Sequence, residues 1–276
     1  MQGDARMKNE EINKNNPYPW KGFLVFLGIY LIALAAQYPM MLDQARAYIE
    51  IMGGSFTYTP NEFALLAMIQ PLLLGVIAIY GGHRFFDRVN LRSLTNEVVE
   101  GSRTVETREK EYTLKDSMPF IVVFAVALAI LNLGFDVIFQ NWLPEIYQPN
   151  FSIPNVKQIL SNIFYSGIGQ EILLRWGIMT TIIYVLSSRG RDLNQWVYII
   201  GIVFTAILYG FAQYNSIASL TDFSFILVLR ILLLNGLDGI LFGWLYYKFH
   251  FEAAVLSHVL VNLLVILGNV LITSIF

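Results

Sequence analysis

The sequence predicts an all-α protein, a polytopic transmembrane helix bundle with about seven membrane segments. Three observations lead to this prediction. The 276 residues are 56% hydrophobic with a mean hydropathy of +0.56, only 14% are charged, and apolar runs of about 20 residues recur along the chain. A run of about 20 residues is long enough to cross a bilayer as a helix. We therefore expect one membrane-embedded helical domain over residues 21–276, preceded by a polar, cytoplasmic tail over residues 1–20.

Composition also narrows the expected partners and cofactors. The net charge of −2 provides no basic field for a nucleic acid, so no nucleic-acid partner is expected. The chain has no cysteine, which excludes disulfides, thiolate metal sites and a cysteine nucleophile. On composition alone, the expected partner is the lipid bilayer.

The apolar runs alternate with polar turns that predict the orientation. Lys and Arg gather in the segment 82–117 and in the turn 187–191, so the positive-inside rule places both turns, and the N-terminus, in the cytoplasm of a cell-membrane protein. The mixed charge of segment 82–117 is typical of a solvated surface. Pro71 is tolerated inside the second run. The predicted spans cover about residues 22–41, 63–81, 118–139, 156–186, 196–213, 223–247 and 253–276.

An eighth segment arises if the sixth span is broken. Gln213 falls near the outer end of the fifth span and His258 near the inner end of the seventh, a mismatch in depth of roughly 15 Å at 1.5 Å per residue. If the two residues meet, a helix must be tilted, broken or re-entrant. The sequence Asn235-Gly-Leu-Asp-Gly239 is the expected break.

The fourth span carries a cluster of polar residues in Gly167-Ile-Gly-Gln170-Glu171-Ile-Leu-Leu-Arg175-Trp-Gly177. Ionised groups at bilayer depth cost about 2.5–3.5 kcal/mol and are functional candidates by default. Glu171 and Arg175 are four residues apart with the acid first, the favourable order for a helical ion pair. Gln170 lies about 100° around the helix from Glu171.

The seventh span carries a second polar pair. His258 and Asn262 are four residues apart in Ser257-His-Val-Leu-Val-Asn262, so both project from one face of an apolar helix. Several polar groups in one hydrophobic bundle indicate a shared interior site. The site is expected to be built from the fourth, fifth and seventh spans.

These motifs resemble those of the CPBP family, the CAAX proteases and bacteriocin-processing enzymes also called the Abi family. Gln170-Glu-x-x-x-Arg175 resembles the family's Glu-Glu-x-x-x-Arg, and His258-x-x-x-Asn262 resembles its third motif. The middle motif, Phe-x-x-x-His, falls at Tyr209-Gly-Phe-Ala-Gln213. Two positions depart from the family, with Gln170 for its first Glu and Gln213 for its His. The motif core covers about residues 156–276.

The resemblance implies an intramembrane endopeptidase, with a membrane-associated peptide or protein as its substrate, and a role for each matched residue. The family's first Glu and middle His activate a water, so Gln170 and Gln213 remove the water-activating side because a carboxamide is not basic. His258 and Asn262 would polarise the substrate carbonyl, and Arg175 would hold Glu171, which could serve as base only by losing Arg175. No metal or other cofactor is expected. Zinc is weakly supported, since Glu171 and His258 are two ligands where catalytic zinc takes three.

Three functions remain open on the sequence. The first is a CAAX-type endopeptidase that uses Glu171 as a surrogate base. The second is a catalytically inactive pseudoprotease that binds a membrane peptide or partner protein. The third is a transporter or channel, suggested by Glu171, Arg230 and Asp238 within the membrane. Arg230 and Asp238 are two helical turns apart and are favoured instead as a stabilising pair. Asp136 is either interfacial or functional. The absence of an internal repeat weakens the transporter interpretation.

Overall fold

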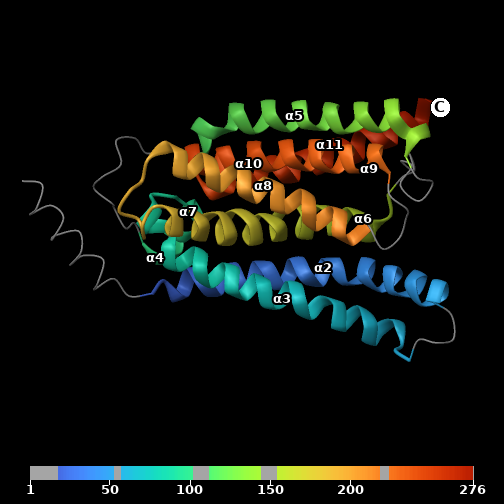
Figure 1. Ribbon diagram of the computed structural model, residues 1–276, viewed down its shortest axis with the longest axis horizontal. Coiled ribbons are helices and arrows are strands. Elements are labelled where there is room, and N and C mark those ends of the chain that lie inside the picture. The colour runs from blue at the N-terminus through green and yellow to red at the C-terminus, as the bar shows by residue number, and fades with distance from the viewer. Residues whose placement is uncertain (1–17, 53–56, 102–111, 144–153, 218–223, 276) are drawn as a thin grey trace, which may run out of the picture.

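The computed structural model describes residues 18–52, 57–101, 112–143, 154–217 and 224–275. Within these ranges the secondary structure is helical with no strand, as predicted. Most of the tail predicted over residues 1–20 lies outside the described residues. Helices run side by side along the long axis of the molecule (Figure 1).

Six helices in the described part of the chain are long and apolar enough to cross a membrane. Large aliphatic side chains on them point outward, among them Ile77 and Ile130, which are 67% and 64% exposed. An outer surface of this kind is suited to lipid, so the protein is an integral, multi-pass membrane protein. The helices are α2 (Trp20–Met52), α3 (Pro60–Phe85), α5 (Leu114–Phe139), α8 (Gln195–Ile217), the joined helix over residues 225–248, and α11 (Phe251–Ile275).

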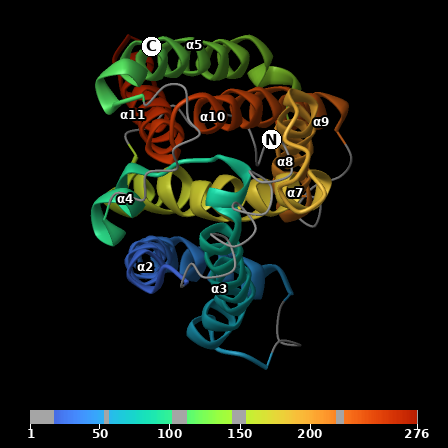
Figure 2. The ribbon, with the colours of Figure 1, turned by 90° about the vertical axis from the view of Figure 1, so that its left-hand side faces the viewer.

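The expected fourth span is a run of four consecutive helical segments. It consists of α6 (Val156–Leu160), the π-helices η5 (Ser161–Gly169) and η6 (Ile172–Met179), and α7 (Thr180–Leu186), with helical residues 170 and 171 between the π-helices. The run lies between α2 and α3 on one side and α10 and α11 on the other (Figures 1 and 2). It is therefore the central element of the bundle.

The break expected at Asn235–Gly239 is absent, and that expectation was wrong. The helix α9 (Phe225–Arg230) continues through the π-helix η7 (Ile231–Asn235) into α10 (Gly236–Lys248) without a loop. Gly239 explains the polar, glycine-containing sequence in another way. A Cβ there would lie 2.7 Å from Cα of Ala206 in α8, so this glycine allows two helices to pack closely.

Among the described contacts, the pair expected between Arg230 and Asp238 is not a direct ion pair, although Arg230 lies within electrostatic reach of Asp238. Arg230 forms a bidentate ion pair with Asp136 of α5, at 2.6 and 2.9 Å. Helical spacing within one segment could not predict this partner, because it comes from a distant helix. Asp136 therefore joins α5 to the helix of residues 225–248.

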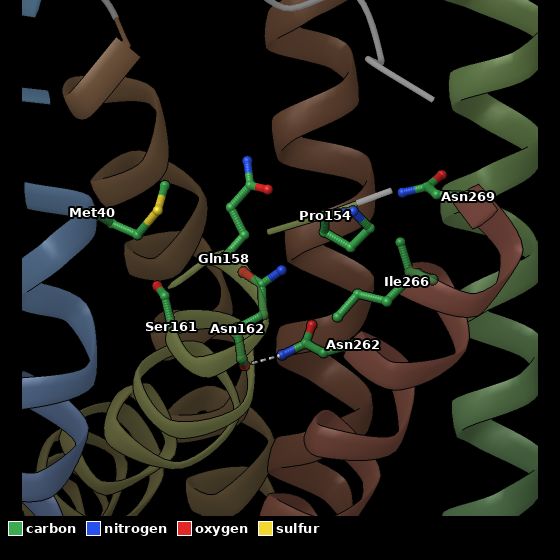
Figure 3. Close-up of a pocket in the computed structure, with 9 residues that line it drawn as sticks. Met40, Pro154, Gln158, Ser161, Asn162, Asn262, Ile266 and Asn269 are labelled. Carbon is green, nitrogen blue, oxygen red and sulfur yellow. Dashed lines mark hydrogen bonds between the residues drawn. The ribbon is translucent and has the colours of Figure 1, made fainter. Parts of the chain in front are cut away.

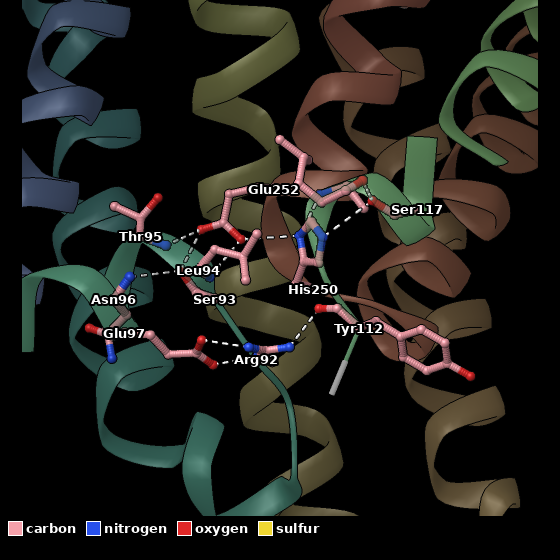
Figure 4. A network of polar contacts seen from close by, with 12 residues as sticks. Arg92, Ser93, Leu94, Thr95, Asn96, Glu97, Tyr112, Ser117, His250 and Glu252 are labelled. Carbon is pink, nitrogen blue, oxygen red and sulfur yellow. Dashed lines mark hydrogen bonds and ion pairs between the residues drawn. The ribbon is translucent and has the colours of Figure 1, made fainter. Parts of the chain in front are cut away.

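The described part of the polar segment after α3 packs partly against the core, and residues 102–111 of the predicted solvated surface lie outside the described residues. Phe86, Val89 and Leu91 are buried in the hydrophobic core. Glu252, at the start of α11, accepts hydrogen bonds from the backbone N–H groups of Leu94 (2.9 Å) and Thr95 (2.8 Å). It thereby caps the short helix α4 (Leu94–Glu100) within the polar network of Figure 4.

We predict that Glu252→Ala loosens this network and lowers the free energy of unfolding by about 1–3 kcal/mol, because two partly buried N–H donors lose a charged acceptor. Thermal unfolding in detergent would measure the loss, and faster hydrogen exchange at Leu94 and Thr95 would locate it. The exposed Glu50→Ala is the control. Equal stability of the two variants would contradict the capping role.

Candidate active site

Glu171 lies at the centre of a buried charge cluster. Its Oε1 accepts a hydrogen bond from Nδ1 of His258 at 2.9 Å, and its Oε2 lies 3.3 Å from Nε of Arg175. Glu171 and Arg175 are fully buried, and His258 is 3% exposed. The contact with Arg175 is an ion pair without hydrogen-bond geometry, since both atoms lack a hydrogen-bond partner. Glu171 thus contacts His258 and remains paired with Arg175. The sequence interpretation had expected that a Glu171 turned into the site would lose Arg175.

Arg175 ties the cluster to two neighbouring helices. Its Nη2 donates to the backbone carbonyl of Gly239 in α10 at 3.1 Å. Its guanidinium carbon lies 5.8 Å from the ring centroids of both Tyr209 and Phe242, within cation–π range. Arg175 therefore stabilises Glu171 and holds the central segment against α8 and α10.

Two contacts orient the ring of His258, one with a ring nitrogen and one with the face of the ring. Its ring stacks on Phe242 with centroids 4.6 Å apart and an interplanar angle of 21°. Because the carboxylate of Glu171 accepts from Nδ1, it favours the tautomer of His258 that is protonated at Nδ1. The lone pair of Nε2 is then available. That nitrogen lies 3.4 Å from Oγ of Ser166 in η5. The arrangement presents a base at Nε2.

Gln170 joins the same group of residues through its carboxamide. Its Oε1 accepts from the hydroxyl of Tyr209 at 3.1 Å and from Oγ of Ser166 at 3.4 Å. Tyr209 of α8 thus joins the site as the sequence anticipated. Gln213 lies in α8, but its side chain is outside the described residues.

A cavity of about 360 Å³ lies one helical turn beyond His258 and contains Asn262 in its wall. Figure 3 shows Asn262 meeting Asn162, whose backbone carbonyl accepts from Nδ2 of Asn262 at 2.7 Å. None of the nine described residues that line the cavity is charged. They are Met40, Pro154, Gln158, Ser161, Asn162, Asn262, Val265, Ile266 and Asn269.

Two residues near the cluster were missed by the sequence interpretation as site members. Asp238 is 7% exposed and lies within electrostatic reach of His258, Arg175 and Glu171. Its Oδ1 has no hydrogen-bond partner among the residues that the structure describes. Ser166 was not singled out, although it precedes Gln170 by four residues and so shares its helix face. That spacing is the signal that could have found it.

The donor set does not fit a catalytic zinc. Both oxygens of Glu171 already contact His258 and Arg175, and a zinc ion bound there would displace the arginine. Among the described residues, no group of three or more His, Cys, Asp or Glu side chains is placed to hold a metal ion. Catalytic zinc takes three protein ligands, which the described residues of this site do not supply.

Comparison with known proteins now bears on this geometry. Residues 152–264 match the family model for the type II CAAX prenyl endopeptidase, Rce1-like. The resemblance to the CPBP family is confirmed. The CPBP-like stretch contains Glu171, Arg175, His258 and Asn262, and it supports a protease at the level of the family. That Gln170 and Gln213 occupy the family's Glu and His positions stays a prediction. No curated protein and no solved structure matches the chain.

Proposed function

We propose that this protein is a CAAX-type membrane endopeptidase in which His258 is the base. The observation that carries the proposal is the 2.9 Å contact between buried Glu171 and Nδ1 of His258. A carboxylate held at Nδ1 keeps Nε2 unprotonated and stabilises the imidazolium that forms when Nε2 accepts a proton. The match to CAAX prenyl endopeptidases supports peptide-bond hydrolysis as the reaction.

The other motif residues take supporting roles in this proposal. Glu171 orients and stabilises His258 rather than acting as the base, because it is fully buried and both its oxygens are engaged. Arg175 holds the carboxylate of Glu171 in place at 3.3 Å. Asn262 donates its amide N–H to the substrate carbonyl, where a donor that meets the developing oxyanion lowers the barrier.

The cavity supports an extended peptide as the substrate. Its uncharged wall carries four carboxamides, from Gln158, Asn162, Asn262 and Asn269, and each can both donate to and accept from a peptide backbone. Gln158 and Asn162 belong to the start of the segment 156–186, whose other end is followed by the basic turn 187–191. With that turn in the cytoplasm of a cell-membrane protein, the peptide enters from the opposite side of the membrane.

The test compares new protein N-termini and released peptides in membranes that carry the wild type or a variant. We expect the wild type to generate cleavage products and His258→Ala to lose the activity by about 10²-fold or more, since general-base catalysis contributes 10²–10⁴-fold. Asn262→Ala should lose about 10²-fold. Asn132→Ala, on α5 away from the cavity, should cleave normally. Unchanged cleavage by His258→Ala would refute the proposal.

A second candidate is a binder that does not cleave, favoured by the carboxamide at Gln170. The double variant Gln170→Glu, Gln213→His separates the two functions, because it restores both expected water-activating groups. The hydroxyls of Tyr209 and Ser166, which donate to Gln170, would serve a glutamate equally well. Cleavage by the double variant alone would assign the native protein as a peptide binder.

A further inference from the structure

Ser166 occupies the position next to the free nitrogen of His258. Its Oγ lies 3.4 Å from Nε2, while Nδ1 of the same ring is held at 2.9 Å by Glu171. A hydroxyl, an imidazole and a carboxylate thus follow one another in the order of a nucleophilic triad. Such triads are recognised by geometry and roles rather than by fold or chain order.

We propose that Ser166 is the nucleophile of a Ser166–His258–Glu171 triad. This inference rests on the endopeptidase proposed above and names the atom that attacks the peptide. It resolves the chemical difficulty left by Gln170, because the attacking oxygen then belongs to the protein and its base is His258. No activated water is needed in the first step.

The surroundings of Ser166 distinguish it from other nearby serines. Ser166 is partly exposed, and its hydroxyl contacts only His258 and Gln170 among the described hydrogen-bonding partners. Ser257, beside His258 in the sequence, is fully buried and donates to the backbone carbonyl of Ile121. Ser161 donates to Gln37 of α2. Of these three, Ser166 alone meets the imidazole.

The rigidity of the imidazole supports the same assignment. Phe242 stacks on the ring of His258, and Arg175 fixes the carboxylate that holds Nδ1. The lone pair of Nε2 therefore has a defined direction, toward η5. The separation of 3.4 Å is long for a hydrogen bond, but nucleophile–base contacts in free enzymes commonly tighten when substrate binds.

The reaction balances without any added reagent. The hydroxyl of Ser166, which donates to Oε1 of Gln170 in the structure, first rotates to donate to Nε2 of His258. Oγ then bonds to the peptide carbonyl carbon as the proton moves to Nε2. The C–N bond then breaks and the amine leaves with that proton, which gives an ester on Ser166. A water molecule transfers a proton to Nε2 and adds to the ester, and release of the acid returns the proton to Oγ. Glu171 accepts the hydrogen bond from Nδ1 throughout and stabilises the imidazolium.

An alkyl fluorophosphonate tests the triad on the full-length protein in detergent. The probe forms a P–O bond to an activated serine and expels fluoride, and mass spectrometry identifies the labelled peptide. We expect labelling at Ser166 in the wild type, none at this position in Ser166→Ala, and labelling at least about 10²-fold slower in His258→Ala. Ser257→Ala, which removes a neighbouring serine hydroxyl, should be labelled like the wild type.

Peptide cleavage provides the second readout and separates the two proposals. Ser166→Ala should lose cleavage by about 10³-fold or more while unfolding at the temperature of the wild type. Wild-type cleavage by Ser166→Ala, or no labelling of Ser166 in the wild type, overturns the triad and leaves the endopeptidase standing. Labelling that depends on His258 supports the triad. If the wild type cleaves no peptide, the proposed endopeptidase is refuted, whether or not Ser166 is labelled.

Discussion

Replacing Arg175 with alanine is expected to lower the free energy of unfolding by about 3–5 kcal/mol, the cost of leaving a buried charge without its partner. Glu171 would keep its hydrogen bond to His258, but its Oε2 would lose the cation 3.3 Å away. The change would also remove the hydrogen bond to Gly239. Chemical or thermal unfolding of the purified protein in detergent measures the loss.

Arg230→Ala is the matched control for this prediction. It removes another arginine ion pair of the membrane helices, but the side chains of Arg230 and Asp136 are 31% and 14% exposed, so the loss should be smaller. The double variant Glu171→Gln, Arg175→Met should recover much of the stability, because it removes both charges together. An Arg175→Ala variant as stable as Arg230→Ala would show that the cluster is not the structural centre of the bundle.

Gly177→Ala is expected to destabilise the protein by about 1–3 kcal/mol, which is typical of overpacking. A Cβ at this position would lie 2.3 Å from Cβ of Ala78 and 2.7 Å from its Cα. Because the second atom is backbone, no side-chain rotation relieves the clash, and η6 must move away from α3. The shift in unfolding temperature, together with the yield of inserted protein, checks this.

Gly28→Ala isolates the packing effect from helix propensity. Gly28 also lies inside a helix, α2, but nothing lies within 4 Å of a Cβ added there. Alanine should stabilise this helix by about 0.5–1 kcal/mol relative to glycine. The two substitutions are therefore expected to act in opposite directions, and a stabilising Gly177→Ala would contradict the close packing of α3 and η6.

Hydropathy predicted the membrane helices well because each span is apolar over most of its length. The span predicted over residues 118–139 is the helix α5, which ends at Phe139 as expected and begins four residues earlier at Leu114. The earlier start follows from the capping box of Thr113 and Asp116, polar residues that hydropathy assigns to a loop. Polar helix ends were thus underestimated.

Partners between helices could not be predicted in the same way. Helical spacing correctly joined Glu171 to Arg175, but it paired Arg230 with Asp238, whereas Asp136 of α5 is the true partner. The family's motifs, rather than spacing, placed His258 with Glu171. Neither helical spacing nor the family's motifs predicted Ser166 as a site residue. Its contact with His258 depends on how two helices are rotated toward each other.

The π-helical run around Ser166 makes the site sensitive to the length of the chain. A helix with i→i+5 hydrogen bonds accommodates an extra residue in a turn, and removing one residue restores the α-helical repeat. Such a deletion within η5 turns everything beyond it by about 100° relative to Asn162. Glu171 would then point where Gln170 points now, toward Tyr209. A deletion, and not only a substitution, could thus exchange amide for acid at this position.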